Sequence, residues 1–201
     1  MTDKTACLVV GAGDDLGGAI ARRFAADGHI ACITRRPRHL DRLEALAEQI
    51  RAAGGEARAF GVDAREEEDT IRLVETIERE VAPIEVAVFN IGANVRFSVG
   101  ETSSQVYRKV WEMAAFGGFL MGREASKGMV ARGRGTIIFT GATASVRGRD
   151  GFSAFAGAKH ALRALAQSMA RELGPQGVHV AHVVIDGGAM IGALTPRAQA
   201  L

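Results

Sequence analysis

Cysteines and aromatic residues are scarce in this chain of 201 residues, and long apolar runs are missing. Its 2 cysteines and 5 histidines form no cluster with metal-ligand spacing, so we expect no metal site. Cys7 and Cys32 lie inside apolar runs, which favours buried thiols over a disulfide. Aromatic residues make up 5% and the formal net charge is +2, which argues against a nucleic-acid partner. No apolar stretch approaches the roughly 18 residues that cross a bilayer, so no membrane partner is expected.

The rest of the composition is that of an ordinary folded protein. Hydrophobic residues make up 47% and charged residues 24%, which excludes intrinsic disorder. The 25 glycines show no three-residue period, which excludes collagen. The start of the chain lacks the charged and long apolar regions of a signal peptide, so we expect a cytoplasmic protein. Residues 1–201 are expected to form one domain.

Short β-branched runs alternate with amphipathic stretches along the chain. Leu43, Leu46 and Ile50, for example, repeat at the three-to-four spacing of a helix. Six strands separated by five helical stretches predict an α/β protein with a parallel sheet and right-handed crossovers. The expected strands are Ala6–Val10, Ile30–Thr34, Ala57–Val62, Ile84–Phe89, Thr136–Thr140 and Val178–Ile185. The expected helices cover residues 16–28, 39–53, 66–81, 103–131 and 153–173.

A glycine-rich turn follows the first expected strand. Gly11, Gly13 and Gly17 separate this strand from the helix that comes next. Such a turn brings backbone N–H groups and a helix N-terminus up to a pyrophosphate. Gly11 and Gly13 let the backbone approach the ligand, and Gly17 lets the helix pack on the strand. The pattern therefore predicts a dinucleotide site, with a plain strand-to-helix turn as the alternative.

Charged residues near the turn bear on which dinucleotide it holds. Asp14 and Asp15, followed by Leu16, place carboxylates where a phosphate would sit, and they are alternatively caps of the helix. Arg35 and Arg36 follow the second strand, where an acid would bind the ribose 2′-hydroxyl and an arginine a 2′-phosphate. Two arginines and no acid predict NADP, with NAD as the alternative cofactor. A solvated approach to the next helix is the other explanation of this basic pair.

Over residues 6–190 the chain resembles the short-chain dehydrogenase/reductase family. The glycine turn at 11–17, Val62-Asp63-Ala64, Phe89-Asn90-Ile91-Gly92, and the strand and helix at 135–141 and 158–175 carry the resemblance. It implies a Rossmann-type doubly wound sheet, NAD(P), and hydride transfer between alcohols and carbonyls of a small-molecule substrate. It also implies homodimers or homotetramers, which fits small and apolar residues on more than one face of the helices at 103–131 and 153–173. By resemblance, the further cofactor contacts are Asp63, Ala64, Asn90, Gly92 and Gly187.

The same resemblance shows which catalytic groups this chain lacks. The family's tyrosine lies four residues before its lysine, and its serine thirteen before the tyrosine; these positions are Phe155 and Ala142 here. The family's asparagine falls on Ala114. Lys159 remains and is expected to hold the nicotinamide ribose, the alternative being a solvated helix lysine. Thr143 is the best candidate for a substrate hydrogen bond, the alternative being an ordinary loop residue.

The end of the chain and the missing hydroxyls leave two functions open. The family's seventh strand is absent, and residues 186–201 are expected to be a truncated or flexible substrate-loop segment. Phe155 has no proton to give, and general acid catalysis is typically worth ~10²–10⁴-fold. One function is an NADP(H)-dependent oxidoreductase with altered or impaired catalysis. The other is a catalytically silent dinucleotide-binding sensor or scaffold.

Overall fold

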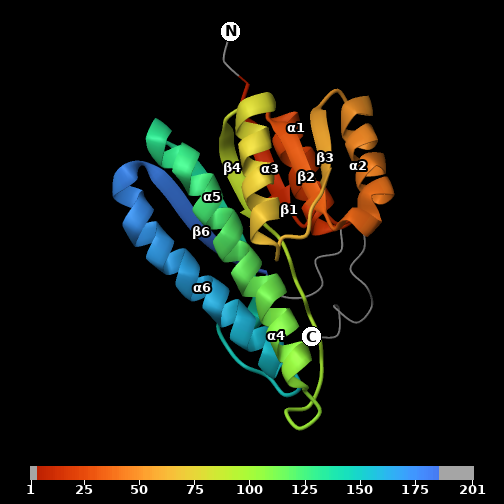
Figure 1. Ribbon diagram of the computed structural model, residues 1–201, viewed down its shortest axis with the longest axis vertical. Coiled ribbons are helices and arrows are strands. Elements are labelled where there is room, and N and C mark those ends of the chain that lie inside the picture. Colours follow the sequence, from red (N-terminus) through yellow and green to blue (C-terminus); the bar gives the residue numbers. More distant parts are fainter. Residues whose placement is uncertain (1–3, 186–201) are drawn as a thin grey trace.

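The computed structural model describes residues 4–185, which form one α/β domain (Figure 1). All strand pairs are parallel, and the strand order is β3-β2-β1-β4-β5-β6. The strands are β1 (Ala6–Val10), β2 (Ile30–Arg35), β3 (Glu56–Gly61), β4 (Ile84–Phe89), β5 (Gly135–Ala142) and β6 (Val178–Ile185). The helices are α1 (Leu16–Ala26), α2 (Leu40–Ala52), α3 (Glu67–Glu80), α4 (Ser104–Trp111), α5 (Gly117–Arg132) and α6 (Ser153–Leu173). This order confirms the predicted Rossmann-type doubly wound sheet. The expectations for residues 186–201 lie outside the described residues.

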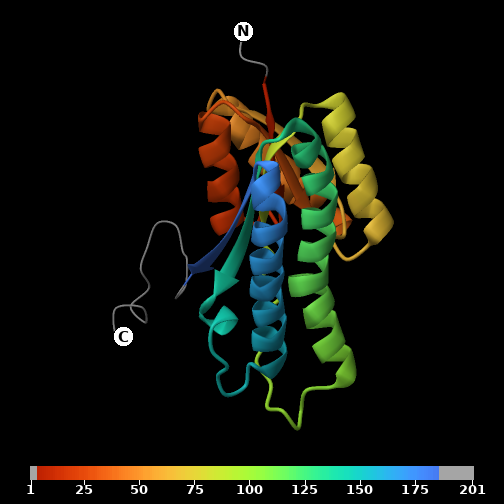
Figure 2. The ribbon, with the colours of Figure 1, turned by 90° about the vertical axis from the view of Figure 1, so that its left-hand side faces the viewer.

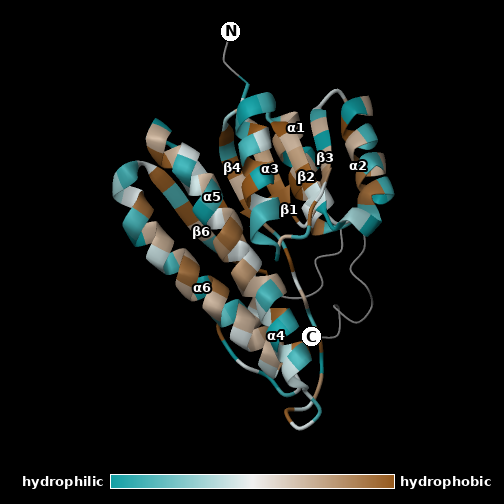
Figure 3. Ribbon diagram, viewed as in Figure 1, coloured by the Kyte–Doolittle hydropathy of each residue, from teal (hydrophilic) through white to brown (hydrophobic). Residues whose placement is uncertain are grey.

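The sheet has a separate apolar core on each face. On one face Leu43 and Ile50 of α2, together with α1, pack against β1 and β2. On the other face Ile77 of α3 and Leu162 of α6, together with α5, pack against the strands. Figure 3 shows the apolar strands enclosed between these helices. Because helices cover both faces, β1 is buried at every residue, as the continuous apolar run in the sequence predicts.

The main departure from the predicted elements is the helix expected over residues 103–131. It consists of α4, a π-helical segment Glu112–Phe116, and α5. A π segment inserts a residue into the helix and so rotates the parts on either side of it relative to each other. Here α4 packs on α6, whereas α5 packs on β4 and β5. The three-to-four spacing does not reveal the insertion, because the pattern on each side of it is still helical.

The carboxyl ends of the strands define the edge where ligands bind in folds of this kind. β1 lies between β2 and β4 in the sheet, so the chain reverses its direction of winding at β1. In doubly wound sheets the ligand lies in the crevice at this reversal. The N-terminal part of α6 and the whole of α4 extend past this edge of the sheet (Figure 2). Side chains from these helices therefore stand beside the strand ends.

The structure also bears on the expectations for membrane-spanning helices, metal sites and the two cysteines. Among residues 4–185 no helix has the length and apolar character needed to cross a membrane. Over the same residues no group of three or more His, Cys, Asp or Glu side chains is placed to hold a metal ion. Cys7 and Cys32 are buried free thiols, as predicted. Burial raises the pKa of Cys32 to about 12, so this thiol stays protonated at neutral pH.

Candidate cofactor and substrate site

A cleft with a volume of about 250 Å³ opens at the carboxyl ends of β1 and β2. It is lined by Val10, Gly11, Gly13, Thr34, Arg35, Arg36, His39, Val62, Asp63, Ala64, Arg65, Ile91, Gly92, Ala93 and Met113. The structure therefore brings together seven predicted cofactor residues: Gly11, Gly13, Arg35, Arg36, Asp63, Ala64 and Gly92. The predicted contact Gly187 lies outside the described residues.

In the glycine turn, no side chain of the three glycines covers the backbone on the side that faces the cleft. Gly11 has a φ of 90°, and a Cβ on Gly17 would lie 2.4 Å from the Gly11 carbonyl oxygen, so neither position accepts a side chain. A Cβ on Gly13 would meet no atom within 4 Å. Asn90 does not line the cleft; its Nδ2 donates to the Gly11 oxygen at 3.1 Å, and the Thr140 hydroxyl donates to its Oδ1 at 3.1 Å. Asn90 thus stabilises the glycine turn through this hydrogen bond without lining the cleft.

The aspartates that follow the turn do not cap α1. Asp15 occupies the N-cap position, but its side chain makes no cap hydrogen bond. Asp14 instead accepts from Nη1 of Arg35 at 3.2 Å. The capping alternative is therefore wrong, because the Arg35 guanidinium, from the end of the neighbouring strand, binds the Asp14 carboxylate. Leu16 begins α1 and, like both aspartates and Gly17, does not line the cleft.

Three arginines, Arg35, Arg36 and Arg65, line the cleft near the end of β2. Arg65 donates from Nε and Nη2 to the two carboxylate oxygens of Asp63 at 2.9 and 2.6 Å, and these bonds lower the pKa of Asp63. Burial and the neighbouring Arg38 lower the pKa of Arg36, and Arg65 and Arg35 add to this effect. The arginines thus outnumber the two carboxylates they contact. Such a cluster suits a phosphate group, which a guanidinium binds through two parallel hydrogen bonds.

Lys159 lies behind the cleft, on α6. Its side chain is 2% exposed, so the alternative of a solvated helix lysine is wrong. Its Nζ donates to the carbonyl oxygens of Ile91 and Thr140 at 2.8 and 3.0 Å. Burial lowers the pKa of Lys159 to about 8. Ile91 lines the cleft, and the Phe155 ring centre is 5.9 Å from Nζ, so the lysine stands between two cavities.

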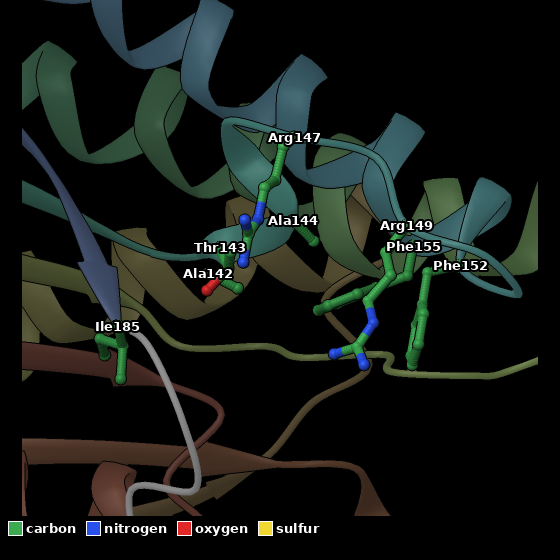
Figure 4. Close-up of a pocket in the computed structure, with 8 residues that line it drawn as sticks. All are labelled: Ala142, Thr143, Ala144, Arg147, Arg149, Phe152, Phe155 and Ile185. Carbon is green, nitrogen blue, oxygen red and sulfur yellow. The ribbon is translucent and has the colours of Figure 1, made fainter. Parts of the chain in front are cut away.

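The second cavity, of about 200 Å³, lies where β5 ends and α6 begins (Figure 4). Its lining residues are Ala142, Thr143, Ala144, Arg147, Arg149, Phe152, Phe155 and Ile185. Thr143 follows β5 directly and opens a 3₁₀ turn, Thr143–Ser145, so it lies beside Ala142 as the sequence order requires. The cleft and the smaller second cavity thus lie on the two sides of Lys159.

The positions that correspond by resemblance to the family's catalytic residues come together here. Ala114 and Phe155 belong to one buried apolar cluster, and Ala142 packs against it. The ammonium of Lys159 lies over the Phe155 ring. The chain's one tyrosine, Tyr107, lies on α4 against Gly157 and does not line the pocket. The structure therefore brings Ala114, Ala142, Phe155 and Lys159 together, and three of these four side chains are apolar.

Several lining residues have no counterpart in the sequence-based predictions. In the cleft these include Arg65, His39 and Met113, and in the pocket Arg147, Arg149 and Phe152. Arg65 stands two residues after Asp63, and this pair of opposite charges was a signal that could have found it. The pocket arginines lie in an aperiodic loop, where sequence spacing does not indicate direction.

Comparisons with known proteins identify the family. The short chain dehydrogenase family model matches residues 5–190. The short-chain dehydrogenase/reductase eriH of Hericium erinaceus is 33% identical over 181 residues, 89% of this chain and 72% of the relative. A solved short-chain dehydrogenase from Rhodopseudomonas palustris is 48% identical with a TM-score of 0.87, covering 97% of this chain and 87% of that one.

A more distant structure shares the fold. A metagenomic short-chain oxidoreductase, solved in complex with NADP, is 24% identical with a TM-score of 0.83, covering 92% of this chain and 83% of that one. The match to the family model and the similarity to the relatives described above establish the family of this chain. This chain belongs to the short-chain dehydrogenase/reductase family of oxidoreductases.

Proposed function

We propose that this chain binds NADP(H) in the cleft and acts as a short-chain oxidoreductase that lacks the family's tyrosine proton donor. The observation that carries the proposal is that one cleft joins a bare glycine turn to a cluster of arginines. The backbone at Gly13 faces open space, which suits a pyrophosphate. NADPH, when bound, supplies a hydride to a carbonyl carbon.

The charges in the cleft favour NADP over NAD. NAD-binding sheets of this type place a free acid after the second strand to bind the ribose 2′-hydroxyl. The carboxylates near this point, Asp14 and Asp63, are already paired with Arg35 and Arg65. Arg36 makes no ion pair with any carboxylate of residues 4–185, and burial together with the charges of the neighbouring arginines lowers its pKa. A 2′-phosphate would relieve this repulsion between like charges.

Lys159 has the contacts of a group that positions the nicotinamide ribose. An ammonium has three N–H donors, and the carbonyl oxygens of Ile91 and Thr140 accept from two of them. The third donor is left for a ribose hydroxyl at the edge of the cleft that Ile91 lines. On the pocket side, we assign to the Thr143 hydroxyl a hydrogen bond to the substrate oxygen.

The apolar catalytic positions favour a second candidate function. Ala114, Ala142 and Phe155 supply no acid, and they pack together in one apolar cluster. A chain that binds the dinucleotide but turns over no substrate would act as a sensor or scaffold. Both candidates share the cofactor site and differ only in whether hydride transfer follows binding.

Calorimetry with NADPH and NADH tests the shared part of the proposal. We expect NADPH to bind at least about tenfold more tightly, since a charged hydrogen bond is worth about 1.5–3 kcal/mol. In the double variant Arg35→Ala/Arg36→Ala the two affinities should become equal within about threefold. The matched control is Arg22→Ala/Arg23→Ala, an adjacent exposed pair on α1.

Turnover then separates the two candidates. NADPH oxidation is followed with a panel of ketones, aldehydes and oxo acids. Slow turnover that depends on Lys159 supports the oxidoreductase. Tight NADPH binding with no turnover on any carbonyl supports the sensor or scaffold. Equal wild-type affinity for NADH and NADPH contradicts the NADP assignment.

A further inference from the structure

Two arginines at the second cavity have no role in the function proposed so far. Arg147 and Arg149 come from the loop between the 3₁₀ turn and α6. Figure 4 shows the Arg147 side chain extending toward Thr143 and the Arg149 side chain lying beside Phe152 and Phe155. Both guanidinium groups therefore border the space next to Phe155.

The charge of these arginines is not compensated within the part of the chain that the structure describes. Neither Arg147 nor Arg149 forms an ion pair with a carboxylate of residues 4–185. The neighbouring Asp150 instead forms an ion pair with Arg96, with 3.7 Å between Oδ2 and Nη2. The other lining residues are uncharged. The pocket thus combines two fixed positive charges with an apolar wall.

The size and wall of the pocket restrict what fits. Its volume is about 200 Å³, below the roughly 300–1,000 Å³ of typical ligand pockets. Phe152, Phe155 and Ile185 offer apolar contact area. A planar guanidinium fork matches a carboxylate, which accepts two parallel hydrogen bonds from it. The matching ligand is a compact molecule with one carboxylate and one apolar body.

We propose that the pocket binds a small oxo acid or the corresponding hydroxy acid, with its carboxylate on Arg147 and Arg149 and its apolar part against Phe152 and Phe155. The redox part of this inference rests on the proposed function, whereas the binding part does not. In the reductive direction the carbonyl carbon gains a hydride from NADPH and the C=O π pair moves to oxygen. Water protonates that oxygen, which leaves the hydroxy acid, NADP⁺ and hydroxide.

Such an anchor compensates for part of what the apolar positions lack. Ala142 and Phe155 give a substrate carbonyl no hydrogen bond that would orient it. A carboxylate held by two guanidinium groups fixes the ligand from its other end, and orientation alone lowers a barrier substantially. Arg147 and Arg149 are therefore substrate-binding residues and determine specificity for acids.

The test measures binding of three probes to the chain of residues 1–201 saturated with NADP⁺, so that no reduction occurs. The probes are phenylpyruvate, the neutral ketone 1-phenylpropan-2-one, and phenyl phosphate. We expect phenylpyruvate to bind at least about tenfold more tightly than the ketone. Arg147→Gln and Arg149→Gln should each weaken phenylpyruvate about tenfold and leave the ketone within about threefold.

Control variants separate the pocket arginines from general charge and from folding. Arg171→Gln removes the same charge from an exposed side chain at the far end of α6 and should change no affinity. Arg147→Lys and Arg149→Lys keep the charge without the fork and should give intermediate affinities. An unchanged thermal midpoint and unchanged NADP⁺ affinity show that each variant is folded.

The outcomes distinguish this inference from the proposed function. If NADP⁺ binds but phenylpyruvate and the ketone bind equally, the inference fails and the cofactor assignment stands. Arginine variants that leave the preference for the acid unchanged also overturn it, as does binding of phenyl phosphate without phenylpyruvate. If NADP⁺ does not bind, the proposed function fails, and the same probes on the cofactor-free chain still decide whether the pocket selects carboxylates.

Discussion

The ammonium of Lys159 lies 5.9 Å from the ring centre of Phe155, one helical turn away on α6. The carbonyl oxygens of Ile91 and Thr140 hold that ammonium in place. By the resemblance to the family, the residue at this spacing would be a tyrosine that donates a proton. The structure therefore keeps a cation that would lower the pKa of a phenol, beside a ring that has no hydroxyl to titrate.

Restoring the hydroxyl groups should create or raise reductase activity. In Phe155→Tyr/Ala142→Ser the new phenol would extend from a ring already placed beside Lys159, and the serine would face the same pocket. We expect a gain of about 10²–10⁴-fold in kcat/KM for NADPH-dependent carbonyl reduction, the typical contribution of a general acid. The two substitutions should be non-additive, because the groups act as a unit.

Phe152→Tyr is the matched control for this restoration. It adds a hydroxyl to another ring of the same pocket, but not one turn before Lys159. It should leave activity at the wild-type level, and adding Lys159→Met to the restored variant should remove the gain. No gain in the double variant while NADPH still binds tightly would mean that the missing hydroxyls are not the limiting defect.

Lys159 should make stability depend on pH. Its pKa is about 8 in the folded state, because burial disfavours the charge, against 10.5 for an ordinary lysine. Between these values the unfolded chain binds more protons than the folded one, so stability rises with pH. Relative to Lys159→Met, the unfolding free energy of the wild type should increase by up to about 3 kcal/mol from pH 7.5 to 10.5.

Urea unfolding at several pH values measures this difference. Both proteins contain Cys7 and Cys32, so the titration of the buried thiols cancels in the comparison. Lys109→Met, which removes an exposed lysine of α4, gives the reference slope. A wild-type curve parallel to that of Lys159→Met over this range would show that the buried ammonium is stabilised as strongly as it is in water.

Asp14 should compete with the cofactor for Arg35. The Asp14 carboxylate accepts from Arg35 at 3.2 Å and is itself largely exposed. Exposed ion pairs are worth about 0.2–1 kcal/mol, so Asp14→Asn should tighten NADPH binding roughly two- to fivefold and change NADH less. Asp15→Asn removes a neighbouring charge that forms no ion pair with an arginine of residues 4–185 and should have a smaller effect. Calorimetry at low salt checks this, and weaker NADPH binding by Asp14→Asn would contradict it.

Alanine substitutions at two glycines of the glycine turn should impair the protein in different ways. A Cβ on Gly17 would lie 2.4 Å from the Gly11 oxygen, so Gly17→Ala should lower stability by about 1–3 kcal/mol. A Cβ on Gly13 would meet nothing, so Gly13→Ala should fold normally. Its methyl group would nevertheless lie where the pyrophosphate approaches, and NADPH affinity should fall about tenfold or more. Thermal unfolding and calorimetry on both variants separate the two effects, and a stable Gly17→Ala that binds NADPH normally would refute the packing argument.

An aromatic row on the outer side of the long helices should lie in a subunit interface. Trp111 stacks on Phe116 and Phe116 on Phe119, with ring centres 5.8 and 6.1 Å apart. Trp111 and Phe119 are 42% and 39% exposed, and together with Phe116 they form a contiguous apolar row of the kind that marks a protein interface. Light scattering at micromolar concentration should give the mass of a homodimer or homotetramer.

Trp111→Glu should shift that equilibrium toward the monomer. The matched control is Leu40→Glu, which places the same charge on an apolar residue with 38% exposure on α2, away from the aromatic row. It should keep the oligomer intact. A monomeric wild-type mass would rule out this interface.

The local sequence was sufficient for most of the elements and for the glycine turn after β1. A continuous apolar run predicted β1, and a run interrupted only by Glu85 predicted β4, because strands buried on both faces are mostly apolar. The glycines at 11–17 predicted the turn, because a tight backbone approach leaves no room for a Cβ. The four-residue spacing of Phe155 and Lys159 placed them on one face of a helix, because the α-helix repeats every 3.6 residues. In each case the deciding interaction lies within a few residues along the chain.

Only the tertiary structure decided the partners of the charged side chains. The pairing of Asp14 with Arg35 joins the turn after β1 to the end of β2, and sequence spacing does not specify it. The π segment rotates α4 against α5, which no periodic pattern records. Arg147 and Arg149 face the pocket because their loop folds back between β5 and α6. These arrangements depend on packing between segments far apart in the chain, where side-chain direction follows from the whole fold rather than from local periodicity.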